Sequence, residues 1–144
     1  IIKVNPKKKM IFDPKESVDL QGHTGPYIQN AFVRISSVLR KLESEVTTDF
    51  IAYNPINEDE KELLMQLSAY KGVISNAAES YDPSVLANYT YSLAKSFHKF
   101  YHNHSILKAE SPDAKSFRLS LSRVVATILA DAMHILGIEM PEKM

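Results

Sequence analysis

Apolar residues recur every three to four positions through four long stretches of this chain, the spacing of one face of an α-helix. The first stretch runs from about Gly25 to Glu43, and the second begins after Asn57. The third and fourth extend roughly over Pro83–His104 and Pro112–Leu136, and strand-like alternation is confined to Lys9–Phe12. The pattern predicts an all-α fold, a helical bundle of about four to five helices.

Signals for helix starts agree with these boundaries. Asp82 and Ser111 are each followed by proline, the arrangement of an N-cap before proline at the first helical position. Asn57 and Glu60 have the spacing of a capping box, and Gly72 marks a point where the second helix could kink or break. The last helix is apolar nearly all round, so we expect it to be the central one.

Composition fits one domain over residues 1–144. Hydrophobic residues make up 44% of the chain and charged residues 24%, close to the globular average. The absence of cysteine rules out disulfides, thiolate zinc sites and thiol nucleophiles, and is compatible with the cytoplasm. No apolar run is long enough for a membrane span. Because the chain starts at Ile1 without an initiator Met, we expect it to be part of a larger protein.

The net charge of zero at first argues against nucleic-acid binding, which needs a positive surface. The charges are unevenly distributed, however. Nine acids accompany two lysines between Glu43 and Asp82, whereas six bases accompany two acids between Tyr91 and Arg123. The sequence therefore permits a local basic face.

Polar residues gather on one flank of the first predicted helix. At about 100° per residue, Tyr27, Asn30, Arg34 and Lys41 share that flank, beside the apolar stripe. An aromatic ring can stack on an unpaired base, Arg can stack or bind phosphate, and Asn can hydrogen-bond a base edge. Any amphipathic helix also presents a polar flank to solvent, so spacing alone leaves both interpretations open.

Histidines near the end of the third helix have two interpretations as well. His98 and His102 are one turn apart, but zinc needs further ligands and no carboxylate at helical spacing supplies one, so no metal site is predicted. Tyr101 and His102 could instead approach RNA, because aromatic and His side chains stack on unpaired bases. We therefore count Tyr101 among the candidate RNA-binding residues.

The run from Asp19 to Arg34, a glycine-punctuated loop leading into a helix that starts Thr-Gly-Pro-Tyr, resembles the C-terminal anticodon-binding domain, of the DALR type, of the class I arginyl-tRNA synthetases. The resemblance extends over essentially the whole chain. It includes residues 7–17, Leu86–Tyr89, Ser96–Tyr101 and the ending Leu136–Met144.

This resemblance implies contacts with the anticodon arm. In that family the loop matching Asp19–Thr24, the tyrosine matching Tyr27, the arginine matching Arg34 and the terminal methionine meet RNA. Asn30 departs from the family's pattern, because many members have a second stacking tyrosine there. The candidate RNA-binding residues are Asp19, Gln21, Gly22, His23, Thr24, Tyr27, Asn30, Arg34, Tyr101 and Met144.

The resemblance also implies a function: recognition of the tRNA anticodon for an arginine–tRNA ligase, which attaches arginine to its tRNA in an ATP-dependent reaction. The catalytic domain would lie upstream and be a partner, together with tRNA, and ATP and Mg²⁺ would act there. This chain has neither of the class I signatures that bind ATP, so we assign it no catalytic residue. A helical protein-interaction module, or the matching domain of another class I synthetase such as the cysteinyl enzyme, remains an alternative.

Overall fold

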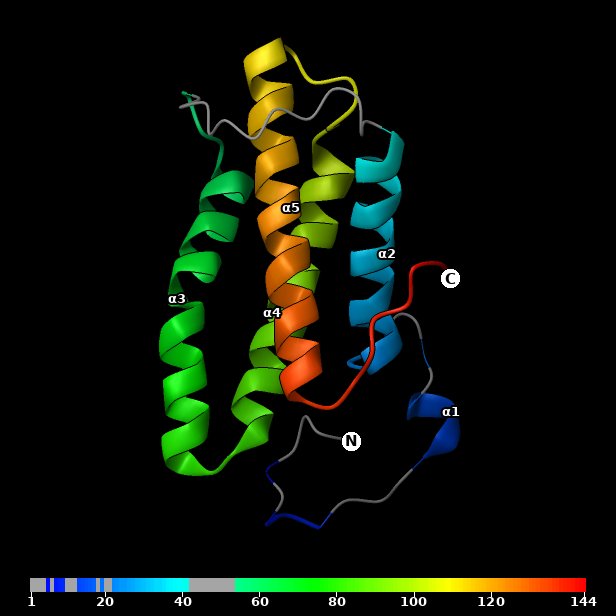
Figure 1. Cartoon of the computed structure of the whole chain (residues 1–144), viewed down its shortest axis with the longest axis vertical. Helices are drawn as coiled ribbons and strands as arrows, with labels where there is room; N and C mark the ends of the chain where they lie inside the picture. Colours follow the sequence, from blue (N-terminus) through cyan, green and yellow to red (C-terminus); the bar gives the residue numbers. More distant parts are fainter. Residues whose placement is uncertain (1–4, 6, 10–12, 18, 20–21, 42–53) are drawn as a thin grey trace.

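In the part of the chain that the computed structural model describes, there are four long helices and one short helix (Figure 1). They are α1 (Pro14–Ser17), α2 (Gly25–Lys41), α3 (Glu58–Ser80), α4 (Pro83–Asn103) and α5 (Pro112–Ile135). The structure describes residues 5, 7–9, 13–17, 19, 22–41 and 54–144. Within that part no residue lies in a strand, so the predicted all-α bundle is confirmed. Residues 10–12 of the segment with strand-like alternation lie outside it. No helix of the described part combines the length and apolarity needed to cross a membrane.

The helix starts use the caps that the sequence predicts. Asn57 and Glu60 form a complete capping box at the start of α3, with both bonds 2.9 Å long. The Asp82 side chain accepts from a backbone amide at the start of α4, and the Ser111 side chain does so at the start of α5. α3 continues unbroken through Gly72, because one glycine costs only about 1 kcal/mol within a 23-residue helix.

The core lies where α2 and α3 both pack against α4 and α5. Each of α4 and α5 also contacts the other, so these two helices share the centre of the bundle, whereas the apolar pattern singled out only α5. Phe97, Phe100, Leu129 and Met133 are among the largest fully buried side chains. The consequence for the site is that α2 and α4 pack directly against each other at the edge of this core.

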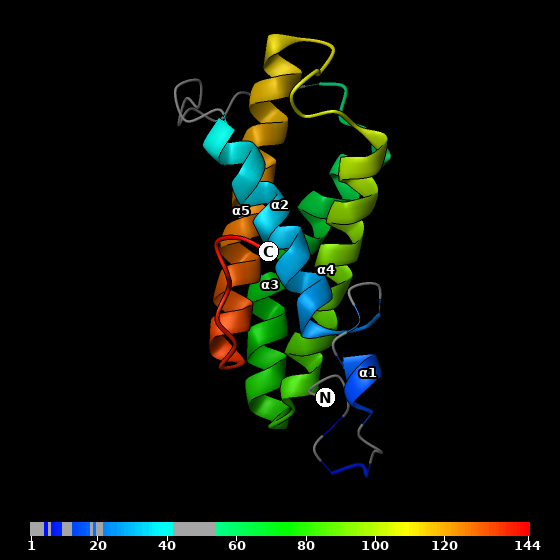
Figure 2. The ribbon, with the colours of Figure 1, turned by 90° about the vertical axis from the view of Figure 1, so that its right-hand side faces the viewer.

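The C-terminal tail, residues 137–144, returns along α2. Gly137 turns the chain after α5 with φ 74°, a conformation that glycine adopts without strain. Gln29 Nε2 then donates to the Glu139 carbonyl over 2.9 Å, and Arg40 Nη1 donates to the Glu142 carbonyl over 3.2 Å. Figure 2 shows α2 with α4 on one side and the C-terminal tail arriving from the α5 side.

Candidate nucleic-acid interface

The loop before α2 is closed by Thr24. Its hydroxyl donates to the Asp19 carbonyl and accepts from the Tyr27 amide at 3.3 Å, and its own amide donates to the Gly22 carbonyl over 2.9 Å. A Cβ atom added to Gly22 would lie 3.3 Å from Asp19 Oδ2, a tight approach that glycine avoids. The first turn of α2 and the loop are therefore joined by hydrogen bonds that fix the position of Tyr27 in that turn. Gln21 lies outside the described residues.

Aromatic side chains from the loop, α2 and α4 line the seam between α2 and α4. We call this set the ring row: His23, Tyr27, Tyr91, His98 and Tyr101. The ring centroids of His23 and Tyr91 lie 3.8 Å apart, those of Tyr27 and Tyr91 5.1 Å, and those of Tyr27 and His98 4.8 Å. All five side chains are half-buried. Four of these partly open rings thus hold one another in place, whereas Tyr101 contacts the core residue Phe97, with ring centroids 6.0 Å apart.

Arg34 adds a cation to the row. Its guanidinium carbon lies 5.1 Å from the centre of the Tyr101 ring, within the range of a cation–π contact, and the residue is exposed. Such an arrangement offers a ligand a flat, positively charged surface rather than a point charge. Planar guanidinium groups stack on bases and bind phosphate through two parallel hydrogen bonds.

The two helices that build the row contain no acid. α2 carries Arg34, Arg40 and Lys41, and α4 carries Lys95 and Lys99, whereas the acids Glu58, Asp59, Glu60, Glu62 and Glu79 all belong to α3. Part of this charge is paired within the bundle, because Lys99 of α4 contacts Asp59 at 2.8 Å and Glu62 at 3.6 Å. The exposed bases Arg34 and Lys95 lie on the helices that build the ring row, and they offer a polyanionic ligand positive charge.

Burial favours the neutral forms of two members of the row, Tyr27 and His98. It raises the pKa of Tyr27, with Tyr91 adding to the effect and Arg34 opposing it. It also lowers the pKa of His98 from 6.5, a shift that the interaction with the Tyr27 backbone opposes and that Arg34 reinforces. At neutral pH we therefore expect a neutral imidazole and a neutral phenol, both of which suit stacking.

A pocket of about 280 Å³ opens at the end of the row, where α4 runs into the loop that precedes α5. Its lining comprises Val38, Tyr101, His102, His104, Ser105, Ile106 and Leu107. The pocket thus combines one aromatic ring and two imidazoles with apolar side walls. Such walls accept a flat heterocycle.

The remaining predicted residues lie on more than one side of α2. Asn30 is half-buried, and Met144 is 61% exposed at the end of the C-terminal tail. By helical geometry, the residues that hold this tail, Gln29 and Arg40, are about 120–160° round α2 from Tyr27 and Arg34. The structure thus brings His23, Tyr27, Arg34 and Tyr101 together, and brings the tail to α2 from the opposite flank.

Sequence reasoning missed Tyr91 and Lys95, and weighed His98 only as a metal ligand. Tyr91, Lys95 and His98 follow one another at the i, i+4, i+7 spacing of a single helix face. That spacing in an acid-free helix was the available signal. The contacts of Tyr91 and His98 with Tyr27 could not be predicted from the sequence, because they depend on how α4 packs against α2.

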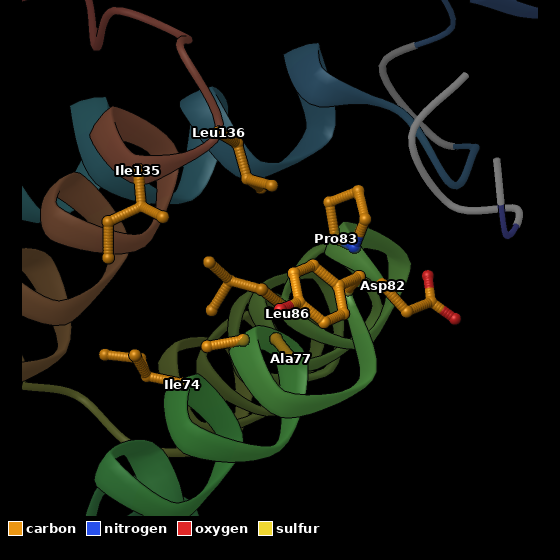
Figure 3. A pocket seen from close by; sticks show the side chains of 9 residues that line it. Ile74, Ala77, Asp82, Pro83, Leu86, Ile135 and Leu136 are labelled. Carbon is orange, nitrogen blue, oxygen red and sulfur yellow. The ribbon is translucent and has the colours of Figure 1, made fainter.

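A metal site and a second pocket are the other candidate sites. Among the described residues, no group of three or more His, Cys, Asp or Glu side chains could hold a metal ion. A second pocket, of about 390 Å³, lies where the α3–α4 turn meets the end of α5. Figure 3 shows its apolar lining, with Ile74, Leu86 and Ile135 among the side chains. It is at the other end of α4 from the ring row's pocket, about 20 Å away by helix rise.

A family of known domains matches most of the chain. The match to the DALR anticodon binding domain covers residues 28–144, which include α2 from its second turn and the whole of α3, α4, α5 and the tail. The chain belongs to this family. The matched residues include three members of the ring row, Tyr91, His98 and Tyr101. The other two, His23 and Tyr27, precede the matched residues.

Known relatives of this DALR domain are arginine–tRNA ligases. That of Porphyromonas gingivalis is 43% identical over 151 residues, and that of Flavobacterium psychrophilum is 44% identical over 144 residues; each match covers 100% of this chain. The Thermus thermophilus arginyl-tRNA synthetase structure matches with a TM-score of 0.87 at 32% identity, covering 99% of this chain and 25% of that one. The chain spans about a quarter of the length of the curated relatives it matches.

Proposed function

We propose that this DALR domain recognises the anticodon stem-loop of arginine tRNA through the surface between α2 and α4. The observation that carries the proposal is the ring row, together with Arg34 over Tyr101, on two helices that contain no acid. Unpaired RNA bases are recognised by stacking on aromatic and Arg side chains beside a positive surface. The relatives named arginine–tRNA ligase support arginine tRNA rather than cysteine tRNA as the ligand.

The parts of the surface have different roles in this proposal. One unstacked anticodon base enters the pocket beside Tyr101, with Arg34 over the ring or shifted to a phosphate. Tyr27, held by Tyr91 and His98, offers a second stacking surface. Lys95 attracts the RNA backbone, since it is exposed on the same face of α4.

The loop and the tail complete the surface on either side of α2. The loop residues Asp19, Gln21, Gly22, His23 and Thr24 contact the anticodon arm in this proposal. Asn30 would hydrogen-bond a base edge where other members stack a tyrosine. Met144 approaches the RNA from the tail, and its flexible thioether suits a flat ligand.

In the whole enzyme this recognition would select the tRNA for arginylation. Ligation would use ATP and Mg²⁺ in the remaining three quarters of such an enzyme, because this chain has no ATP-binding signature of the class I synthetases. Its partners would then be tRNA and the catalytic domain of the same protein, in the cytoplasm. The residues of this chain serve to bind and orient RNA.

Fluorescence anisotropy with a labelled arginine anticodon stem-loop tests the proposal. Replacing Tyr101 or Arg34 by alanine should weaken binding by about tenfold, since one base–aromatic stack is worth about 1–3 kcal/mol. Lys71→Ala is the matched control for Arg34→Ala, because Lys71 is an exposed base on α3 and its loss changes the net charge equally. It should leave the affinity within about twofold.

Two results would overturn the proposal. One is unchanged affinity when Tyr101 and Arg34 are replaced together. The other is equal affinity for a stem-loop with an unrelated anticodon. Salt-independent binding, or none at low salt, would favour a helical protein-interaction module instead, because RNA binding weakens as salt rises.

A further inference from the structure

One wall of the pocket beside Tyr101 is formed by the loop that connects α4 to α5. Residues 104–111, which we call the α4–α5 loop, supply four of the pocket's lining side chains, including Ser105 and Leu107. Ile106 anchors this loop in the core with 2% of its surface exposed. The shape of the pocket therefore depends on what fixes the rest of the loop.

Arg118 of α5 binds the α4–α5 loop through hydrogen bonds. Its side chain is only 5% exposed, and Nη1 donates to the Ser105 carbonyl over 3.1 Å. Nη1 and Nη2 also bind the Glu110 carboxylate in a fork, at 2.8 and 2.7 Å. The guanidinium thus ties both ends of the α4–α5 loop to one point of α5, and its planar fork does so with a set geometry.

The remaining edge of the guanidinium binds α3. Arg118 Nε donates to Glu60 Oε1 over 2.7 Å, and Glu60 is completely buried. Glu60 Oε2 accepts from the Asn57 amide as part of the capping box. One carboxylate therefore completes a helix cap and neutralises a buried cation. A buried pair of this kind is kept only with good geometry and full hydrogen bonding.

The neighbouring acid, Asp59, holds the end of α4. Its carboxylate contacts Lys99 at 2.8 Å, Asn103 at 2.9 Å and His104 at 3.1 Å. These hydrogen bonds lower the pKa of Asp59 to about 2, and the one from Lys99 has the largest effect. The first turn of α3 thus holds both sides of the pocket wall: α4 through Asp59, and the loop through Glu60 and its partner on α5.

We propose that Arg118, with the adjacent carboxylates Asp59 and Glu60, is a positioning device that holds the α4–α5 loop against Tyr101 and so sets the shape of the pocket for an unpaired base. None of the three side chains lines the pocket. They act through the backbone of Ser105, the fork to Glu110 and the contacts to His104. The inference rests on the proposed RNA-binding function of the same pocket.

The test combines two variants of the device with a labelled arginine anticodon stem-loop. Arg118→Lys keeps the charge but cannot form the fork, and Glu110→Gln weakens the fork at a residue whose side chain is 57% exposed, so folding is retained. Each should weaken binding about threefold to tenfold well below the melting temperature, with reduced discrimination between loops that differ in one anticodon base. Tyr70→Phe is the control, because it removes the Tyr70–Asp131 hydrogen bond of α3 and α5 outside the pocket lining.

A merely structural role predicts a different result. Arg118→Lys, Glu110→Gln and Tyr70→Phe would then lower the melting temperature and leave both affinity and discrimination unchanged. Wild-type binding by the first two variants, while Tyr101→Ala loses affinity, overturns this inference and leaves the proposed function standing. Wild-type binding by Tyr101→Ala overturns both. If Arg118→Lys acts through the pocket, its effect should largely disappear in a Tyr101→Ala background.

Discussion

The imidazole of His98 meets the ring of Tyr27 edge-on, with ring centroids 4.8 Å apart and planes inclined by 67°. Tyr91 packs on Tyr27 as well, at 5.1 Å. The Tyr27 ring is therefore oriented by α4 before any ligand arrives. Pre-orientation of this kind favours binding, because less side-chain freedom is lost when the ligand stacks.

Removing His98 should loosen that orientation. We expect His98→Ala to weaken binding of the anticodon stem-loop about threefold, with a small loss of stability, because an aromatic pair contributes about 0.5–1.5 kcal/mol. His98→Phe is the matched control, since it retains an edge against Tyr27, and should bind nearly as well as the wild type. Equal affinity of the alanine variant in anisotropy measurements would contradict a role for this contact.

The same histidine should make stability depend on pH. Its pKa is lowered from 6.5, chiefly by burial, so the unfolded chain takes up a proton that the folded chain resists. The stabilising effect of the neutral ring is complete above about pH 6.5 and is lost as the pH falls toward the folded-state pKa. Thermal melts of the wild type and His98→Gln at about pH 7.5 and 5.5 should show a smaller pH effect in the variant. Identical pH effects would refute this assignment.

Arg40 should matter through the C-terminal tail. Because it donates to the Glu142 carbonyl, Arg40→Ala frees the end of the tail, and we expect an RNA affinity reduced about as much as by deletion of Met144. The variant with both changes should bind RNA only slightly more weakly than either single variant, since both changes remove the same contact. Lys71→Ala controls for the lost charge, as above. Fully additive losses would show that Arg40 acts on RNA independently of the tail.

Tyr81 offers a test of the fold away from the proposed interface. It ends α3 in the left-handed conformation with φ 54° and is 91% exposed. Left-handed backbone costs a residue with a side chain about 1–2 kcal/mol, while glycine loses about 0.5–1 kcal/mol through its greater freedom when unfolded. Tyr81→Gly should therefore raise the free energy of unfolding by roughly 0.5 kcal/mol in urea titrations, whereas Ser80→Gly, one residue earlier within α3, should lower it by about 0.5–1 kcal/mol.

The sequence predicted the helices well because their signals are local. Apolar spacing, the Asn57–Glu60 capping box and the prolines after Asp82 and Ser111 each act within one or two turns, and the structure places helix starts there. Gly72 was predicted to kink or break this helix; the break is wrong, since α3 runs from Glu58 to Ser80 and one glycine costs only about 1 kcal/mol.

Part of the candidate site was also accessible from the sequence. The flank of α2 with Tyr27 and Arg34 follows from helix geometry, and the resemblance to arginyl-tRNA synthetases gave the family, which the match over residues 28–144 confirms. Their assignment to RNA contacts stays a prediction. The sequence assigned Glu60 only to a capping box and gave Asp59 no tertiary partner, but each of these acids binds specific partners on α4 or α5.

By itself, then, the sequence determined which segments are helical and which residues share a flank, because both depend on neighbours within a turn of the chain. Only the tertiary structure decided that Tyr27 lies against His98 and Tyr91, that Arg34 covers Tyr101, and that acid-free α2 and α4 stand together. It also showed that Arg118, counted among the bases of a surface, is buried with Glu60. These contacts join residues tens of positions apart, and helix packing alone brings them together.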